Sequence, residues 1–132
     1  QTCALPICVK AVWIACTNPA QSMPDAQFVR AALERTEFVV VQEIYANTDT
    51  TAFADLLLPA TGWGEKEGTV TNSERRITRV RAAIPAPGAA RHDWAIAAEF
   101  ARRLARRLER PHAEAMFAWN TPEEVFGEHR ES

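Results

Sequence analysis

Three short apolar runs, separated by segments of helical or turn character, constrain the fold of this chain more than any other feature. The runs are residues 9–16, 37–44 and 54–60. Between them, apolar residues recur at helical spacing in 24–35, and 49–54 reads as a short helix with Asp49 as its N-cap. This alternation is typical of βαβ units, whose crossovers are right-handed in about 98% of cases. The valines of the second run favour a parallel sheet covered on both faces. The sequence therefore predicts an α/β fold with a small parallel sheet.

The second half of the chain follows a different pattern. Residues 68–81 alternate in period two on both sides of Asn72-Ser73-Glu74, which predicts a hairpin or an extended excursion. A loop rich in proline and glycine follows at 84–91, and the longest helix is expected over 92–108. Thr121 and Glu124 have capping-box spacing and open a final helix that ends near Arg130. Three strands with uncovered edges make a thin domain, so we expect the chain to be part of a larger protein.

Composition excludes several classes of protein. Hydrophobic residues make up 47% of the 132 residues and charged residues 24%, as in an ordinary globular domain. The net charge of −2 argues against nucleic acid as a partner, and the arginines of 101–110 are interpreted as a solvated helix face. No apolar run approaches the roughly 20 residues of a membrane span.

The first seven residues, QTCALPI, match the translation of a common DNA-sequencing adaptor. We therefore expect residues 1–7 to be an artefactual leader, the alternative being a natural short N-terminus. On this interpretation Cys3 is artefactual, Cys8 lies at the junction, and Cys16 is the cysteine that clearly belongs to the protein. This leaves no disulfide framework and favours a reducing, cytoplasmic compartment.

Polar residues that directly follow the first two strands are candidate ligand-binding groups, because open α/β sheets bind ligands at the carboxyl ends of their strands. Asn18 follows the first strand, with Ser22 four residues later. A polar side chain there can hydrogen-bond a ligand while the next helix, expected over 24–35 after a loop, directs its N–H groups toward an anion, although Asn-Pro also forms a plain turn. Gln42 and Glu43 end the second strand, where an acidic residue accepts hydrogen bonds from ribose in dinucleotide-binding folds. No glycine fingerprint accompanies them, which argues against an ordinary NAD site.

Two further candidates come later in the chain. Lys66 lies in a glycine-flanked loop and could neutralise a phosphate, or simply belong to a solvated Glu-Lys-Glu turn. Asp93 precedes the long helix and could accept from a base edge or cap that helix. The three histidines show no ligand spacing, and no nucleophile has an evident base partner. The residues thus support binding; they predict no catalytic residue and no metal ligand in this chain.

Four segments together resemble the prokaryotic molybdopterin oxidoreductases, the family of nitrate reductases and formate dehydrogenases. They are TNPAQSMPD (17–25), VVVQEIY (39–45), TTAFADLLLPATGWGEKEGTVTNSERRITRVR (50–81) and APGAARHDW (86–94). The resemblance covers about Val9 to Ser132 and is greatest to the catalytic subunit of assimilatory nitrate reductase. It implies a partial Rossmann-like domain over 8–110 that binds molybdopterin guanine dinucleotide. Residues 111–132 would be a linker and helix leading to a further, C-terminal part.

The resemblance also assigns the cofactor-binding residues. It implies that the guanosine and pyrophosphate end of the cofactor is lined by Asn18, Ser22, Gln42, Glu43, Lys66 and Asp93. Glu43 departs from the family's more common aspartate by one methylene, which puts its reach in question. The parent enzyme would carry a molybdenum bis(molybdopterin guanine dinucleotide), with a 4Fe-4S cluster bound outside this chain.

The substrate and the partners are likewise implied by the resemblance. The parent would reduce nitrate to nitrite, with electrons from a donor protein or subunit. Its partners would also include the cofactor and the remaining domains of the parent chain. A formate dehydrogenase α subunit and a free-standing α/β binding module remain the alternative interpretations.

Overall fold

The structure is a computed structural model that describes residues 9–131. The predicted leader 1–7 with Cys3, and Cys8 at its junction, therefore lie outside the described residues. The chain divides into two compact units, one up to Ala60 and the other from Thr61 onward. Each unit is built around its own elements. The expected boundary near residue 110 stays a prediction.

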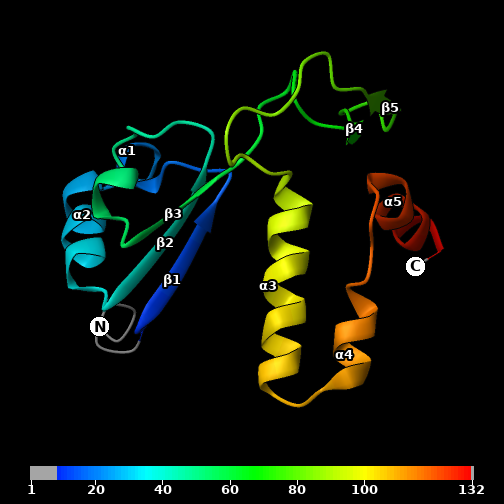
Figure 1. Cartoon of the computed structure of the whole chain (residues 1–132). Helices are drawn as coiled ribbons and strands as arrows, with labels where there is room; N and C mark the ends of the chain where they lie inside the picture. The colour runs from blue at the N-terminus through cyan, green and yellow to red at the C-terminus, as the bar shows by residue number, and fades with distance from the viewer. Residues whose placement is uncertain (1–8, 132) are drawn as a thin grey trace. The chain divides into compact units, whose positions relative to one another are not determined.

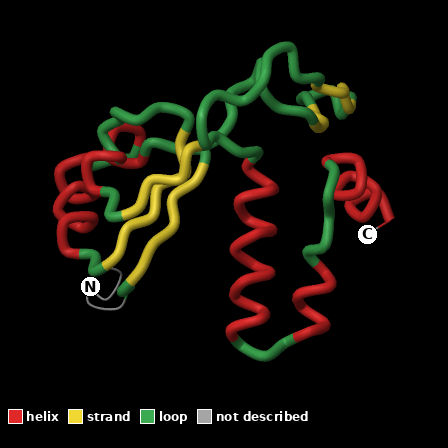
Figure 2. The backbone as a smooth tube through the Cα atoms, viewed as in Figure 1, coloured by secondary structure: helices red, strands yellow, loops and turns green. Residues whose placement is uncertain are grey.

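The first unit contains a three-stranded parallel sheet (Figures 1 and 2). Its strands are β1 (Ala11–Ala15), β2 (Phe38–Glu43) and β3 (Leu56–Pro59), with β2 in the centre. Val12 pairs with Val39, and Val41 pairs with Leu57. All three apolar runs thus form the strands that their composition predicted, and the α/β class with a small parallel sheet is confirmed.

Helix α2 (Ala26–Arg35) covers one face of this sheet, and the residues packed between the two form the core of the unit. The cluster of buried residues consists of Ile14, Ala20, Leu33, Val39 and Val41. Val39 and Val41 of β2 are almost completely inaccessible to solvent. Burial of a valine side chain contributes roughly 1.5–3 kcal/mol, so the central strand is the main anchor of the first unit.

Two connecting segments differ from expectation. The segment between Asn18 and the helix predicted over 24–35 contains a short helix, α1 (Pro19–Ser22), which begins at a proline whose missing N–H costs nothing there. The helix predicted at 49–54 is a single 3-10 turn, η1 (Thr51–Phe53), and its N-cap is Thr50. The prediction that Asp49 caps it is wrong, because its carboxylate instead pairs with Arg30 of α2, 2.6 Å away.

The second unit consists of a hairpin and helices. Strands β4 (Gly68–Thr71) and β5 (Ile77–Val80) pair antiparallel, as the period-two pattern predicted. The helices are α3 (Asp93–Arg107), α4 (Pro111–Met116) and α5 (Pro122–Glu131). Helix α4 was not anticipated. The expected start of α5 is confirmed, since Glu124 N donates to Thr121 Oγ1 at 3.2 Å.

Candidate functional site

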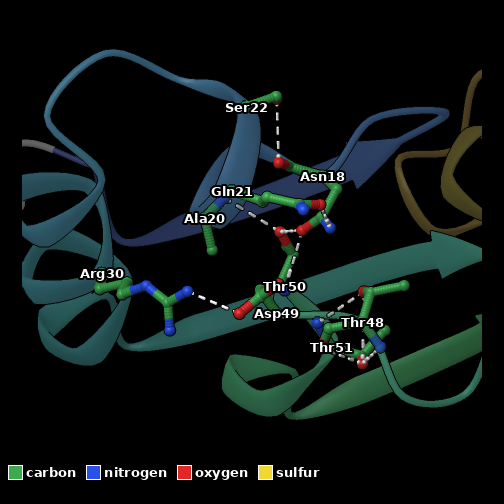
Figure 3. A network of polar contacts seen from close by, with 9 residues as sticks. All are labelled: Asn18, Ala20, Gln21, Ser22, Arg30, Thr48, Asp49, Thr50 and Thr51. Atoms are coloured by element: carbon green, nitrogen blue, oxygen red, sulfur yellow. Dashed lines mark hydrogen bonds and ion pairs between the residues drawn. The ribbon is translucent and has the colours of Figure 1, made fainter.

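The Asn18 side chain connects the end of β1 to the loop that follows β2 (Figure 3). Its Oδ1 accepts from the backbone N–H of Thr50 at 3.1 Å and from the Thr50 hydroxyl at 2.6 Å. Thr50 is fully buried, and its Oγ1 also accepts from Ala20 N at 3.1 Å. The Asn18 amide donates to Gln21 Oε1 at 3.0 Å. In this structure the Asn18 side chain therefore makes its hydrogen bonds within the protein, to Thr50 and Gln21.

The first turn of α1 is satisfied in the same internal way. The backbone N–H groups of Gln21 and Ser22 both donate to Asn18 O, at 3.0 and 2.9 Å. The Ser22 hydroxyl donates to the same carbonyl at 2.9 Å. An anion at this point would have to compete with these contacts. The assignment of Asn18 and Ser22 to cofactor binding stays a prediction.

Gln42 and Glu43 lie side by side at the carboxyl end of β2, but their environments differ. Successive side chains of a strand point to opposite faces of the sheet. Gln42 is 4% exposed. Glu43 is more accessible, and its Oε1 accepts from Ile44 N at 2.7 Å, which closes the turn after the strand. If both bind one ligand, they approach it from different sides of the sheet end.

Lys66 and Asp93, which are 27 residues apart in sequence, are brought together in the second unit. Lys66 Nζ and Asp93 Oδ2 are 2.9 Å apart, and both side chains are about two-thirds buried or more. Asp93 is the first residue of α3, where a carboxylate also interacts favourably with the helix dipole. The N-cap is His92, so the capping alternative for Asp93 is wrong and its side chain faces the lysine.

The loop that carries Lys66 is fixed by backbone contacts within the second unit. Thr61 N donates to Arg91 O at 3.0 Å, which ties the loop's start to the residues before α3. Gly62 N donates to Glu65 Oε2 at 2.8 Å, and Gly64 O accepts from Ala83 N at 2.7 Å. The lysine is therefore presented from an ordered loop. This excludes the alternative of a freely solvated Glu-Lys-Glu turn for Lys66, although Glu67 itself is exposed.

A cavity of about 380 Å³ lies beside the Lys66–Asp93 pair. Its walls come from the Lys66 loop, the hairpin, the start of α3 and one face of α5. Trp63, 65% exposed, lies under the Lys66 ammonium, whose nitrogen is 5.5 Å from the ring centroid. The cavity thus combines a cation, a carboxylate and an aromatic surface, the groups that suit a phosphorylated heterocycle.

Two polar atoms next to this cavity are buried and have no hydrogen-bond partner among residues 9–131. They are His92 Nδ1 and Trp94 Nε1, and both residues line the cavity. Their rings stack with centroids 6.3 Å apart. Because buried donors and acceptors are normally satisfied, such atoms indicate a bound group or water. The wall of the cavity thus offers two polar ring atoms to a ligand or a water molecule.

Sequence reasoning missed most of the cavity wall. Trp63, His92, Trp94 and the α5 residues Val125 and Phe126 were not singled out, yet they line the same space as Lys66 and Asp93. A tryptophan between two glycines in a charged loop was a usable signal for the first of them. No local signal could have found the α5 residues, because their place depends on packing against β4.

The described residues also bear on catalysis by metals and on membranes. No group of three or more histidine, cysteine or acidic side chains is placed to hold a metal ion within 9–131. Over the same range, none of the helices has the length and apolar character that a membrane crossing requires.

The chain thus combines an α/β unit with polar strand ends and a second unit with a Lys–Asp cavity, and comparison with known proteins identifies its family. The family model of molybdopterin oxidoreductases matches residues 3–103. The chain belongs to the molybdopterin oxidoreductase family.

Curated relatives include both nitrate reductases and formate dehydrogenases. A nitrate reductase of Klebsiella oxytoca is 51% identical over 92% of this chain. The assimilatory nitrate reductase catalytic subunit of Bacillus subtilis is 37% identical over 94%. The F420-dependent formate dehydrogenase subunit alpha of Methanocaldococcus jannaschii is 39% identical over 92%. The chain spans only 13%, 16% and 17% of these three proteins.

Proposed function

We propose that this chain is a cofactor-binding segment of a molybdenum-dependent nitrate reductase. The observation that carries the proposal is the Lys66–Asp93 pair on the wall of a cavity that contains unsatisfied polar atoms. The 51% identity to a nitrate reductase supports nitrate as the substrate of the full-length protein. The proposed cofactor is a molybdenum bis(molybdopterin guanine dinucleotide), bound in part by residues 8–110.

The residues of the cavity fit the nucleotide end of this cofactor. Lys66 has three N–H donors, so it can contact a phosphate oxygen while it still pairs with Asp93. Asp93 can accept from the amino and imino groups of a guanine edge in charge-assisted hydrogen bonds. Trp63 offers a flat apolar surface beside both groups. These side chains bind and orient the nucleotide; none of them transfers a proton or an electron in the reaction.

The first unit would supply the remaining contacts at the carboxyl ends of its strands. Gln42 and Glu43 would face the guanosine end of the cofactor, its ribose in particular, at the end of β2, the usual ligand edge of open α/β sheets. The Asn18–Thr50 network fixes the loop beside them. Asn18 and Ser22 would then contribute mainly by holding this edge in shape, with any direct contact made at the cost of their internal bonds.

The cofactor supplies the two-electron redox chemistry at its molybdenum when it is bound. In the proposed parent enzyme, a 4Fe-4S cluster lies outside residues 1–132, and a donor protein or subunit delivers the electrons. We propose a cytoplasmic location for it. The 39% identity to a formate dehydrogenase subunit alpha keeps the same segment of that enzyme as the second candidate.

The experiment that tests the assignment uses the full-length enzyme with Lys66→Ala and Asp93→Ala. Removing one charged hydrogen-bond partner costs about 1.5–3 kcal/mol. We therefore expect the retention of guanine nucleotide and molybdenum, measured after gel filtration, to fall by about tenfold or more. Arg106→Ala, which removes an exposed ion pair with Glu114, is the matched control and should retain both. Full cofactor content in both cavity variants would refute the assignment. If the wild-type enzyme oxidises formate with an electron acceptor and does not reduce nitrate, the second candidate is favoured.

A further inference from the structure

The hydrogen bonds of Thr50 fix the orientation of the Asn18 side-chain amide (Figure 3). The Thr50 hydroxyl accepts from Ala20 N, so its own proton is free to be donated to Asn18 Oδ1. The backbone N–H of Thr50 can only donate, and it points at the same oxygen. Two donors therefore meet at this position. An amide oxygen can accept from both, whereas an amide nitrogen could accept from neither, so the partners decide which way the amide faces.

The loop that carries Thr50 is held on both sides of this residue. Before it, the Asp49 carboxylate pairs with Arg30 of α2 at 2.6 Å. After it, Thr51 N donates to Thr48 Oγ1 at 3.2 Å, and Thr48 N donates to Thr51 Oγ1 at 2.8 Å. Thr50 itself is fully buried, so water does not compete for its two donors. These donors therefore keep a fixed position.

The amide nitrogen of Asn18 is turned away from this network. Oδ1 and Nδ2 branch from the same carbon, so holding the oxygen toward Thr50 directs the nitrogen to the other side. One of its two N–H groups donates to Gln21 Oε1 at 3.0 Å, and Gln21 is exposed. The second N–H has no acceptor among residues 9–131. The side of the amide that faces away from Thr50 thus offers hydrogen-bond donors to a ligand.

We propose that Thr50 is a positioning residue for cofactor binding, which fixes the Asn18 amide so that Nδ2 donates to a phosphate oxygen of the cofactor. The proposal rests on the proposed function and deepens it, because it names the chemistry that Asn18 contributes. Thr50 is fully buried and touches no ligand itself. Binding gives up the bond to Gln21 and keeps both bonds from Thr50. A hydrogen bond to an anionic oxygen is roughly twice as strong as a neutral one, so this exchange favours the bound state.

A double-mutant cycle on the full-length enzyme tests whether Thr50 acts through Asn18. The rate at which guanine nucleotide is lost during dialysis is measured for Thr50→Val, Asn18→Ala and the double variant. Thr50→Val removes the shorter of the two bonds to Oδ1, and we expect the loss to be about three- to tenfold faster. Asn18→Ala should have at least the same effect. The double variant should be no faster than Asn18→Ala, because no amide is left to position. Effects that multiply in the double variant would overturn the proposal.

Two further variants separate positioning from a loss of stability. Val39→Ala removes buried methyl groups near the start of β2, away from its ligand end, and destabilises the same core. Thr50→Ser keeps the hydroxyl. Both should lose the nucleotide at the wild-type rate under conditions in which amide exchange shows that they are folded. If either loses it as fast as Thr50→Val does, packing or stability explains the effect and the proposal is overturned.

A measurement on the wild-type enzyme does not depend on how any variant folds. With the cofactor bound, the Thr50 amide should exchange as slowly as the amides of β2, because its N–H keeps Asn18 Oδ1 as acceptor. Exchange as fast as that of an exposed loop would mean that Asn18 turns its oxygen to the ligand, and it would overturn the proposal.

The outcome for this proposal can be told apart from the outcome for the proposed function. Lys66→Ala and Asp93→Ala test the cofactor site without touching the Thr50 network. If these two variants release the cofactor while Thr50→Val keeps it as well as wild type, this proposal is refuted and the proposed function stands. A wild-type enzyme that contains no guanine nucleotide would refute both.

Discussion

Two completely buried threonines, one in each unit, show how differently the two parts of the molecule use their polar groups. The Thr50 hydroxyl donates to Asn18 and accepts from Ala20 N, so its hydrogen-bonding capacity serves the first unit. The Thr61 hydroxyl in the second unit is equally buried but has no partner among residues 9–131. The buried polar groups around Thr50 therefore act as scaffold. The second unit keeps unsatisfied groups, Thr61 Oγ1, His92 Nδ1 and Trp94 Nε1.

The largest effect is expected when the scaffold network is broken. Thr50→Val keeps the shape of the side chain but leaves Asn18 Oδ1 and Ala20 N each without one partner. We expect the free energy of opening of the first unit to fall by about 1–3 kcal/mol. Exchange of the β2 amides of Val39 and Val41 measures it. Thr50→Ser retains the hydroxyl and is the control; a loss as large in this variant would show that the buried site responds to any change in packing and not specifically to the loss of the hydrogen-bond network.

The next largest effect is expected in the second unit, at the cavity proposed to bind the nucleotide. Trp63→Ala in the full-length enzyme removes the aromatic surface under Lys66, and stacking of a base on such a ring contributes roughly 1–3 kcal/mol. We expect the retention of guanine nucleotide to fall by several-fold. Trp63→Phe should restore most of it. If both variants retain the nucleotide fully, the exposed ring takes no part in binding.

A much smaller effect is expected at the second threonine, and it is the direct counterpart of Thr50→Val. Thr61→Val replaces a hydroxyl that has no partner with a methyl of similar size. The opening free energy of the cofactor-free second unit, measured from the α3 amides, should change by less than about 0.5 kcal/mol or rise. A loss like that of Thr50→Val would mean that the Thr61 hydroxyl is bonded in solution, and the contrast between the units would fail.

The sequence predicted the elements well because their signals are local. Valines in an uninterrupted run and Thr121 before α5 act on their own segments. Asp25 acts in the same way at the start of α2, where its side chain accepts from Phe28 N at 3.2 Å. The error at Asp49 arose because a tertiary ion pair with Arg30 outweighed a local cap. The pairing of Lys66 with Asp93 could be suspected only from the resemblance, since nothing local joins residues 27 apart. The orphaned ring nitrogens beside them required the packed structure.

The smallest predicted effect concerns a charge cluster that belongs to neither network. On α3, Glu99 Oε2 lies 2.8 Å from Arg102 Nη2, and Glu99 Oε1 lies 2.7 Å from Arg103 Nε. Hydrogen bonds from these two guanidinium groups lower the pKa of Glu99 below its ordinary value. A carboxylate whose pKa is lowered in the folded state stabilises the fold at pH values above the pKa it has in the unfolded chain. This contribution is lost as the pH falls through the pKa of the folded state. The thermal midpoint of wild type should therefore slightly exceed that of Glu99→Gln at pH 7, and the two should converge in acid. Since partly exposed ion pairs contribute little to stability, a large loss of the thermal midpoint in Glu99→Gln would show that the cluster is part of the scaffold after all.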